Sequence, residues 1–201
     1  LTLVRPQGAP PETDHIWGFW DGPNLAAASR LARKRWHSWS IVTGRGKAVL
    51  RSQKRPYTAL HRLDWTAHCR EAASRAGVAI LTGGEAATAA DQVFDSRPPP
   101  VPDGIMLQHF LGLEVRSGRA VFDPDTCILM DFRVDQSRGM HFIYLLPFSA
   151  TEALVESTLF TPSVCPESYY RVEIAAYLEA YFGLDEFETI RTERGVIPLG
   201  I

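Results

Sequence analysis

The sequence has few cysteines and no long apolar run. Its three cysteines lie far apart among 201 residues, at Cys69, Cys127 and Cys165. They form neither a disulfide framework nor a metal-ligand spacing, so we expect a reducing compartment and no metal. No run of about 18 apolar residues is present, which excludes a membrane-spanning helix in this chain, and no signal peptide is recognised. A formal net charge of -2 provides no basic surface for nucleic acid.

The sequence also lacks a dinucleotide-binding fingerprint. No G-x-G-x-x-G occurs in it, and the spacing at Thr82-Gly83-Gly84 indicates a turn instead. The chain begins on Leu-Thr-Leu-Val without an initiator Met and ends abruptly at Ile201. Because the fingerprint normally follows the first strand of such a fold, we expect an internal fragment of a longer protein.

The first hundred residues alternate between predicted strands and helices. Apolar runs predict strands at Leu1–Val4, within Ser40–Leu50, and at Tyr57–Leu60, Val78–Leu81 and Gln92–Phe94. The strand at Val78–Leu81 is expected to be buried. An Ala-rich helix is predicted over Asn24–Trp39, and a second over Trp65–Ala76 between Asp64 and Gly77. This alternation is typical of an α/β layer.

A stiff proline-rich connector, Pro98–Pro102, precedes a change of pattern. Beyond it the predicted strands follow one another with short turns, at Ile105–Arg116, Ile128–Asp135, His141–Pro147 and Ala153–Phe160. Consecutive strands predict an antiparallel sheet. A helix over Pro166–Phe182 follows, with Gly183 just past its end and an apolar stripe typical of a core, and then a strand over Phe187–Leu199.

One carboxylate, Glu156, stands in the middle of the apolar stretch Thr151–Phe160. Side chains alternate along a strand, so Glu156 shares a face with Leu154, Thr158 and Phe160. One interpretation is a surface Glu on an edge strand, which this stretch alone favours because Glu is rarely buried. The other is an acid in an apolar cavity, with a raised pKa and a proton to deliver.

The two preceding strands change that balance. Cys127–Gln136 contains Met-Asp-Phe-Arg-Val-Asp-Gln, Met140–Ser149 is aromatic-rich with a Leu-Pro near its end, and Glu156-Ser157-Thr158 follows. This series resembles the flavin-dependent lycopene cyclases of carotenoid synthesis, of the bacterial and plant β-cyclase type. In that family the last motif reads Glu-Glu-Thr or Glu-Asp-Thr, so Ser157 stands here in place of the second acid. The similarity is densest over Gln108–Phe160.

The resemblance implies an α/β (α+β) fold with two kinds of domain. Residues 1–100 would form part of an FAD/NAD(P)-binding Rossmann-like domain that lacks its first strand and fingerprint. Residues 101–186 would form an antiparallel-sheet substrate domain with one helix. Residues 187–201 would form a strand returning to the FAD domain, since Gly195–Gly200 resembles the family's Val-Ile-Pro-Met-Gly segment.

Two segments resemble family segments near the cofactor. Asp14–Asp21, with His15 and Trp17, is similar to a His-Thr-Trp-Ser-Phe-His segment, and Asp95 and Arg97 lie in an Asp-Ser-Arg turn. The resemblance implies that these four side chains contact FAD. The alternatives are a hydrophobic anchor that pins a loop in the first segment and a capped turn in the second.

The implied reaction is acid-catalysed, non-redox ring closure at the ends of lycopene or a related linear C40 carotenoid, giving β-type rings. Reduced FAD, with NAD(P)H as reductant, would stabilise the cation, and Glu156 would act as the proton donor or as a carboxylate that stabilises the cation. If the acid missing at Ser157 were the donor, Asp131 or Asp135 would have to replace it. Both alternate with Arg133 on one strand face, which forms either a solvent-facing or structural row or a row that faces a cavity.

A C40 hydrocarbon dissolves only in lipid, so we expect peripheral contact with the cytoplasmic side of a membrane. Two other functions remain open from the sequence. One is another FAD-dependent oxidoreductase, either a monooxygenase or a polyprenyl reductase. The other is a carotenoid-binding protein without enzymatic activity. The fragment alone need not be active in any of these cases.

Overall fold

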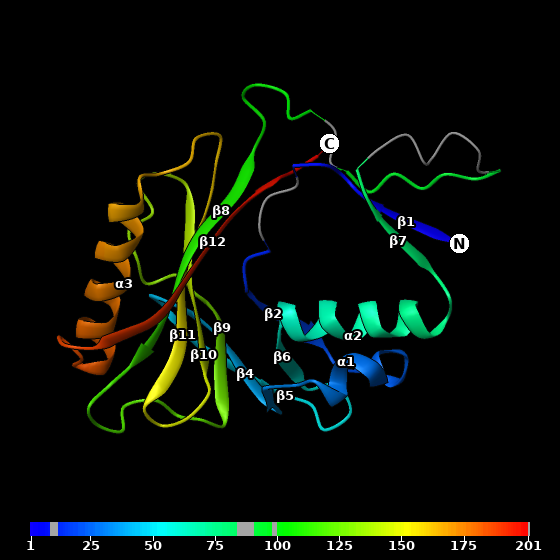
Figure 1. Cartoon of the computed structure of the whole chain (residues 1–201). Coiled ribbons are helices and arrows are strands. Elements are labelled where there is room, and N and C mark those ends of the chain that lie inside the picture. The colour runs from blue at the N-terminus through cyan, green and yellow to red at the C-terminus, as the bar shows by residue number, and fades with distance from the viewer. Residues whose placement is uncertain (9–11, 84–90, 98–99, 201) are drawn as a thin grey trace.

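The computed structural model describes residues 1–8, 12–83, 91–97 and 100–200 of the chain. Within them the strands form three sheets, of seven, three and two strands (Figure 1). The elements in chain order are β1 (Thr2–Arg5), β2 (Ile16–Trp20), the short 3-10 helix η1 (Pro23–Leu25), α1 (Ala26–Arg30), β3 (Lys34–Trp36), β4 (Ser38–Thr43), β5 (Gly46–Arg51), β6 (Tyr57–His61), α2 (Arg62–Arg75), β7 (Ala79–Thr82), β8 (Leu107–Arg116), β9 (Thr126–Asp131), β10 (Met140–Pro147), β11 (Glu152–Thr161), α3 (Glu167–Phe182) and β12 (Glu188–Pro198).

The large sheet has the strand order β12-β8-β11-β10-β9-β4-β5. Its pairs are antiparallel except for β4 with β9, which run parallel. The strand β11 lies between β8 and β10, so the interpretation of Glu156 as a surface residue of an edge strand is wrong. A turn aligns the start of β11, because the Ser149 hydroxyl accepts the N–H groups of Thr151 at 3.1 Å and Glu152 at 3.0 Å.

Helix α3 covers one face of the large sheet (Figure 1). Its stripe of Tyr170, Ile174, Tyr177 and Leu178 packs on inward side chains of the sheet to form the main core, as predicted. Gly183 ends the helix with φ of 57°, a left-handed conformation that glycine adopts without a Cβ penalty. The alternation in β11 is confirmed, because Val155 and Leu159 belong to this core while Leu154 packs on the opposite face.

The three-stranded sheet, ordered β2-β6-β3, packs against that opposite face through a second core. Trp36 lies at its centre, fully buried, and its indole N–H donates to the Pro147 carbonyl at 3.1 Å. The predicted helix over Asn24–Trp39 is therefore wrong beyond Arg30. Packing of Trp36 beside Tyr57 outweighs the helix propensity of the Ala-rich segment before it.

The two-stranded sheet pairs β1 with β7 in parallel. Both strands were predicted, but β7 is exposed rather than buried. The predicted helix before β7 forms as α2, and Gly77 follows it with φ of 70°. The strand predicted at Gln92–Phe94 is wrong, because it pairs with no strand in the described residues and Phe94 is 92% exposed.

The large sheet takes strands from both sides of the proline-rich connector. We expected it to begin after residue 100, but β4 and β5 come earlier in the chain and extend it beyond β9. Strand β12, expected to return to the FAD domain, pairs with β8. Pro98 and Pro99 of the connector lie outside the described residues. None of the described helices is long and apolar enough to cross a membrane.

Candidate functional site

Glu156 lies in a row of residues that crosses four strands of the large sheet. Strand register aligns Tyr144 on β10 with Glu156 on β11, Glu156 with Gly112 on β8, and Gly112 with Glu193 on β12. Directly paired residues project to the same face. All four therefore belong to the face opposite α3, and two carboxylates flank a glycine on it.

The surroundings of Glu156 disfavour its charged form. The residue keeps part of its surface accessible, but burial raises the pKa of its carboxyl, and the nearby Glu193 carboxylate raises it further, to about 8. The Thr158 hydroxyl donates to Glu156 Oε1 at 2.9 Å, which opposes this rise only in part. At neutral pH Glu156 is therefore mostly protonated, as a proton donor must be.

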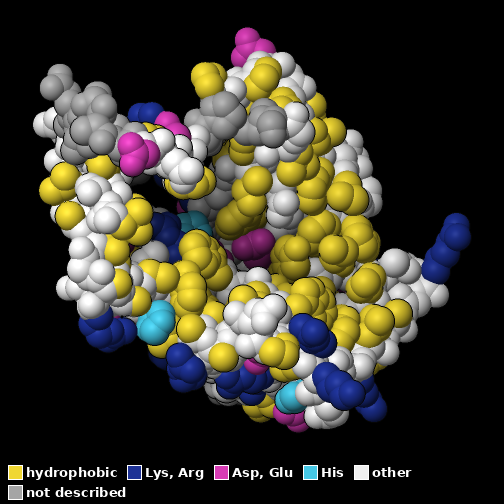
Figure 2. Space-filling view, turned by 90° about the vertical axis from the view of Figure 1, so that its right-hand side faces the viewer, with side chains coloured by type: hydrophobic (Ala, Val, Ile, Leu, Met, Phe, Trp, Pro, Cys, Tyr) yellow, Lys and Arg dark blue, Asp and Glu magenta, His cyan; other side chains and the backbone are white. Residues whose placement is uncertain are grey.

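Aromatic rings are the main neighbours on this face. Phe142 packs edge-on against Tyr144 at 5.1 Å and against Phe132 at 5.5 Å between ring centroids, and it lies 6.1 Å from Phe160. The molecule is hollowed on the side shown in Figure 2, where hydrophobic side chains gather around the hollow and an acidic side chain lies inside it. Aromatic faces attract cations, so the ring cluster around Phe142 suits a carbocation.

A second aromatic group lies between the three-stranded sheet and strand β4 of the large sheet. Trp20 packs edge-on against Trp39 at 4.6 Å and against Tyr57 at 5.1 Å. Burial raises the pKa of Tyr57 well above its usual value, and that of Tyr144 to about 12, and in both cases the Glu156 carboxylate contributes. Both phenols are therefore neutral beside Glu156 at physiological pH.

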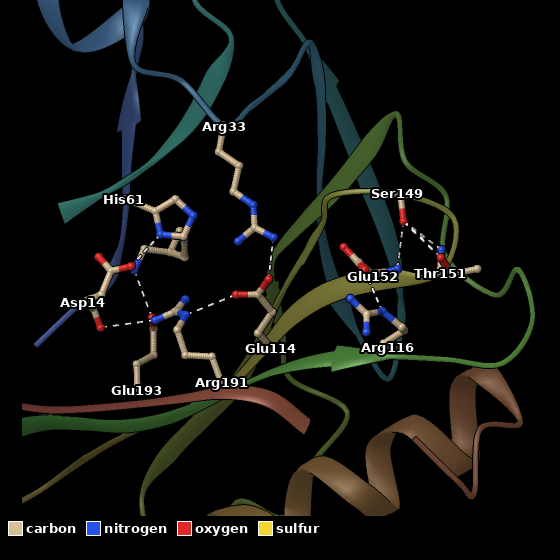
Figure 3. Close-up of polar contacts among 11 residues, drawn as sticks. Asp14, Arg33, His61, Glu114, Arg116, Ser149, Thr151, Glu152, Arg191 and Glu193 are labelled. Carbon is tan, nitrogen blue, oxygen red and sulfur yellow. Dashed lines mark hydrogen bonds and ion pairs between the residues drawn. The ribbon is translucent and has the colours of Figure 1, made fainter. Parts of the chain in front are cut away.

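An ion network that includes Glu193 joins the large sheet to residues next to the three-stranded sheet (Figure 3). The Glu114 carboxylate accepts from Arg33 and, at 3.2 Å, from Arg191 Nε. Arg191 Nη1 donates to Glu193 Oε2 at 2.6 Å and to the Asp14 carbonyl at 3.2 Å. These charged hydrogen bonds fix the orientation of Glu193.

The sequence did not predict this network. Arg33 lay in the segment predicted to be helical, and its partner Glu114 is 81 residues away. The one available signal was Arg191-Thr192-Glu193, where opposite charges alternate and share a strand face.

Asp131 and Asp135 do not join Glu156. Asp131 is fully buried on the α3 side, where it accepts from Arg133 Nε at 2.9 Å and from the Tyr177 hydroxyl at 2.8 Å. Its carboxylate also accepts the Arg133 N–H at 3.1 Å, a turn that ends β9 before the predicted residue 135. Asp135 is exposed and bonded to Ser137. For Asp131 the solvent-facing interpretation is wrong, and its contacts are structural.

Ser157, which replaces the family's second acid, also projects to the α3 side. It is fully buried, and its hydroxyl lies 2.8 Å from His141 Nε2 in a hydrogen bond. Adjacent residues on a strand face opposite ways. The replacement therefore leaves the surroundings of Glu156 unchanged.

The four residues assigned to the cofactor are spread over the surface. Trp17 is 45% exposed and follows Ile16, which packs in the core between the two sheets, so alternation along β2 directs Trp17 away from the large sheet. His15 Nε2 is bonded to the Thr13 hydroxyl at 3.1 Å. Asp95 and Arg97 pair with each other in an exposed capped turn, which lowers the pKa of Asp95 to about 2. The structure describes no contact between that turn and the other two residues.

Two pockets lie away from Glu156. One lies beside the β4–β5 hairpin and the end of α3, lined in part by Arg45, Lys47 and Phe182. The other lies between β8, β12 and the start of α3, lined in part by Phe110 and Cys165. Neither pocket includes Glu156 or Tyr144.

Comparison with known proteins decides the family. The family model described as lycopene cyclase protein matches residues 64–201, which is more than half of the chain. The chain belongs to the lycopene cyclase family. The matched part includes β11, which carries Glu156, its partners β8 and β10, and β12 beyond β8. The resemblance of the sequence motifs is confirmed.

Two relatives extend this result. The chain is 28% identical over 219 aligned residues to a lycopene β-cyclase from Paracoccus sp., covering 99% of this chain and 54% of that protein. It thus spans about half the length of this curated cyclase. A geranylgeranyl bacteriochlorophyll reductase-like protein from Thermoplasma acidophilum shares the fold, with a TM-score of 0.63 at 13% identity, over 98% of this chain and 59% of that one. The α/β fold class is confirmed.

Proposed function

We propose that this chain is the acid-bearing part of a lycopene cyclase, with Glu156 as the proton donor. One observation carries the proposal: Glu156, a carboxyl whose pKa is raised by burial and by the Glu193 carboxylate, lies beside Tyr144 on a partly accessible sheet face. Membership of the lycopene cyclase family supports a linear carotenoid as substrate.

The chemistry balances without electron transfer. The Glu156 carboxyl gives a proton to a terminal carbon–carbon double bond, and a neighbouring double bond attacks the tertiary cation to close a six-membered ring. The ring cation then loses one proton, so that substrate and product are isomers. Phe142 and Tyr144 adjoin Glu156, and their ring faces would stabilise the cation during closure.

A reduced flavin, with NAD(P)H as its reductant, is part of the proposal for the whole protein. An anionic flavin would add negative charge near the cation. His15, Trp17, Asp95 and Arg97 do not form one cradle in the described residues, since the last two are paired with each other at the surface. No step of the proposal goes through the flavin.

Expression in a lycopene-accumulating bacterium tests the proposal. The full-length protein is compared with Glu156→Gln, which keeps the shape of the side chain but has no acidic proton. Glu152→Gln is the matched control, because it removes a carboxylate from the same strand, where Glu152 pairs with Arg116 at the sheet's end. Pigments are separated by chromatography, and cell fractionation in the same strain reports peripheral membrane contact.

We expect cyclic carotenes from the parent and from Glu152→Gln, and only linear lycopene from Glu156→Gln. Removal of a general acid typically costs 100-fold or more in rate, about 10² to 10⁴. Cyclisation by Glu156→Gln at the parent rate would refute the role of Glu156. Lycopene left intact by the parent would favour a redox flavoprotein or a carotenoid carrier, for which an acid at this position has no use.

A further inference from the structure

Gly112 leaves space between the two carboxylates of the row. A Cβ at this position would lie 3.0 Å from Glu193 Cγ, 3.1 Å from a Leu154 methyl group and 3.5 Å from Glu156 Cβ. The backbone here is ordinary extended strand, so conformation does not require glycine. What requires it is the close approach of side chains from the two flanking strands over β8.

Glu193 is held rigidly on this face. It is 4% exposed, and its Oε2 accepts both the Ile16 N–H at 2.9 Å and Arg191 Nη1 at 2.6 Å. Those two bonds come from different sheets and use one oxygen. In the described residues Oε1 makes no hydrogen bond, and Arg191 is shared with Glu114. The carboxylate of Glu193 is therefore fixed in place.

We propose that Glu193 is a positioning residue, a fixed carboxylate that Gly112 admits beside Glu156 and that keeps the proton on Glu156 until a substrate takes it. The inference rests on the proposed function, because it assigns the partner that prepares the acid. A fixed negative charge in the same row of a poorly hydrated site opposes the ionisation of Glu156. Glu193 accepts the Ile16 N–H and Arg191 Nη1, whereas Glu156 accepts only the Thr158 hydroxyl in the described residues. Repulsion by the fixed Glu193 carboxylate therefore keeps the proton on Glu156.

The other groups around Glu156 cannot replace Glu193 in this role. Tyr144 faces it from β10 and Tyr57 from β6, and both are neutral because burial raises their pKa. Arg191 is bonded to Glu193 and Glu114 rather than to Glu156. Among the described residues, the Glu193 carboxylate is the charged neighbour that raises the pKa of Glu156 beyond the effect of burial.

Infrared titration of the full-length, cofactor-loaded protein tests this directly. The carboxylic acid band of Glu156 is assigned by its loss in Glu156→Gln, and its midpoint pH is measured in the parent and in Glu193→Gln. Glutamine can still accept from Ile16 and Arg191 but carries no charge. We expect the midpoint to fall by on the order of one pH unit. The alkaline limb of the cyclisation rate should fall with it.

Glu114→Gln is the matched control, because it removes another carboxylate bonded to Arg191 but not one in the row. Its midpoint should stay at the parent value. Glu193→Asp keeps the charge, so the midpoint of Glu156 in this variant should stay close to the parent value. If Glu193→Gln does not fold, Gly112→Ala provides the second measurement, because its Cβ would lie 3.0 Å from Glu193 Cγ and 3.5 Å from Glu156 Cβ. The midpoint of Glu156 should then differ from the parent value, and an unchanged midpoint would count against coupling across Gly112.

The outcomes separate the two proposals. An unchanged midpoint in folded Glu193→Gln, or an equal shift in Glu114→Gln, overturns the positioning role but leaves Glu156 as donor. A lowered midpoint with an unchanged pH profile of the rate also overturns it, because Glu156 would then not supply the proton. A lowered midpoint together with a lowered alkaline limb supports the inference.

Discussion

Loss of one hydroxyl, in Tyr177→Phe, should destabilise the protein without touching the Glu156 face. The Tyr177 hydroxyl donates to Asp131 Oδ2 at 2.8 Å across the boundary between α3 and the large sheet. Tyr177 is 2% exposed and Asp131 is fully buried. Phenylalanine fills nearly the same volume, so the substitution removes a hydrogen bond and leaves packing almost unchanged.

The magnitude follows from what Asp131 retains. Its carboxylate still accepts three bonds from Arg133, at 3.1, 2.9 and 2.6 Å, so the charge is not left unpaired. A hydrogen bond to a charged group contributes about 1.5 to 3 kcal/mol. We expect the free energy of unfolding to fall by about 2 kcal/mol.

Urea unfolding of the full-length protein, followed by tyrosine and tryptophan fluorescence, measures this loss. The midpoint should fall with little change in the slope. Tyr181→Phe is the matched control, because its hydroxyl also bonds to Arg133, at the carbonyl oxygen, but the residue is 41% exposed. The control should change stability by less than about 0.5 kcal/mol. Equal effects of the two variants, or loss of cyclisation in folded Tyr177→Phe, would refute the structural assignment of Asp131.

Two further predictions concern packing and pH. Gly18→Ala places a Cβ 2.0 Å from the Tyr57 hydroxyl oxygen, so it should lower the free energy of unfolding in urea by about 1 to 3 kcal/mol. Adding Tyr57→Phe to Gly18→Ala removes that oxygen and should recover part of the loss, and strictly additive effects of the two substitutions would contradict the clash. Burial lowers the pKa of His141 in the folded protein. As pH falls through about 6.5, the usual pKa of histidine, His141 takes up a proton more readily in the unfolded chain than in the folded one, so the free energy of unfolding decreases. His141→Asn should reduce the loss of stability between about pH 8 and pH 5, and an unchanged loss would show that other groups cause it.

Sequence periodicity was sufficient for the second half of the fold. Strands β8, β10, β11 and β12 and helix α3 form within a few residues of their predicted ends. Each is a long element in which apolar side chains recur with a period of two residues for a strand or 3.6 residues for a helix. The prediction that Glu156 shares a face with Leu154 and Thr158 depended on that alternation alone, and the structure confirms it.

The first half could not be predicted in the same way, because its decisive contacts are not local. The segment after Arg30 forms strands since Trp36 enters a core made with β6, β9, β10 and β11, and donates to a carbonyl 111 residues away. The ion network has the same character. Arg33, Glu114 and Arg191 meet only after two sheets have packed together, and no period in the sequence encodes that meeting.

The alternation of β11 also places Ser157, which stands where the family has its second acid, on the face opposite Glu156. Residues 156 and 157 occupy opposite faces, one beside Tyr144 and Gly112 and the other against His141 on the α3 side. An acid at 157 would have to be matched by the packing of α3 and the protonation of His141, whereas an acid at 156 is tuned by Gly112 and Glu193 on the far side of the sheet. The two positions therefore answer to different neighbours and can change independently. Within the Glu156-Ser157-Thr158 motif, position 156 projects to the face that also carries Tyr144, Gly112 and Glu193. Under the proposed function, the face to which an acid of the motif projects therefore matters more than the number of acids in it.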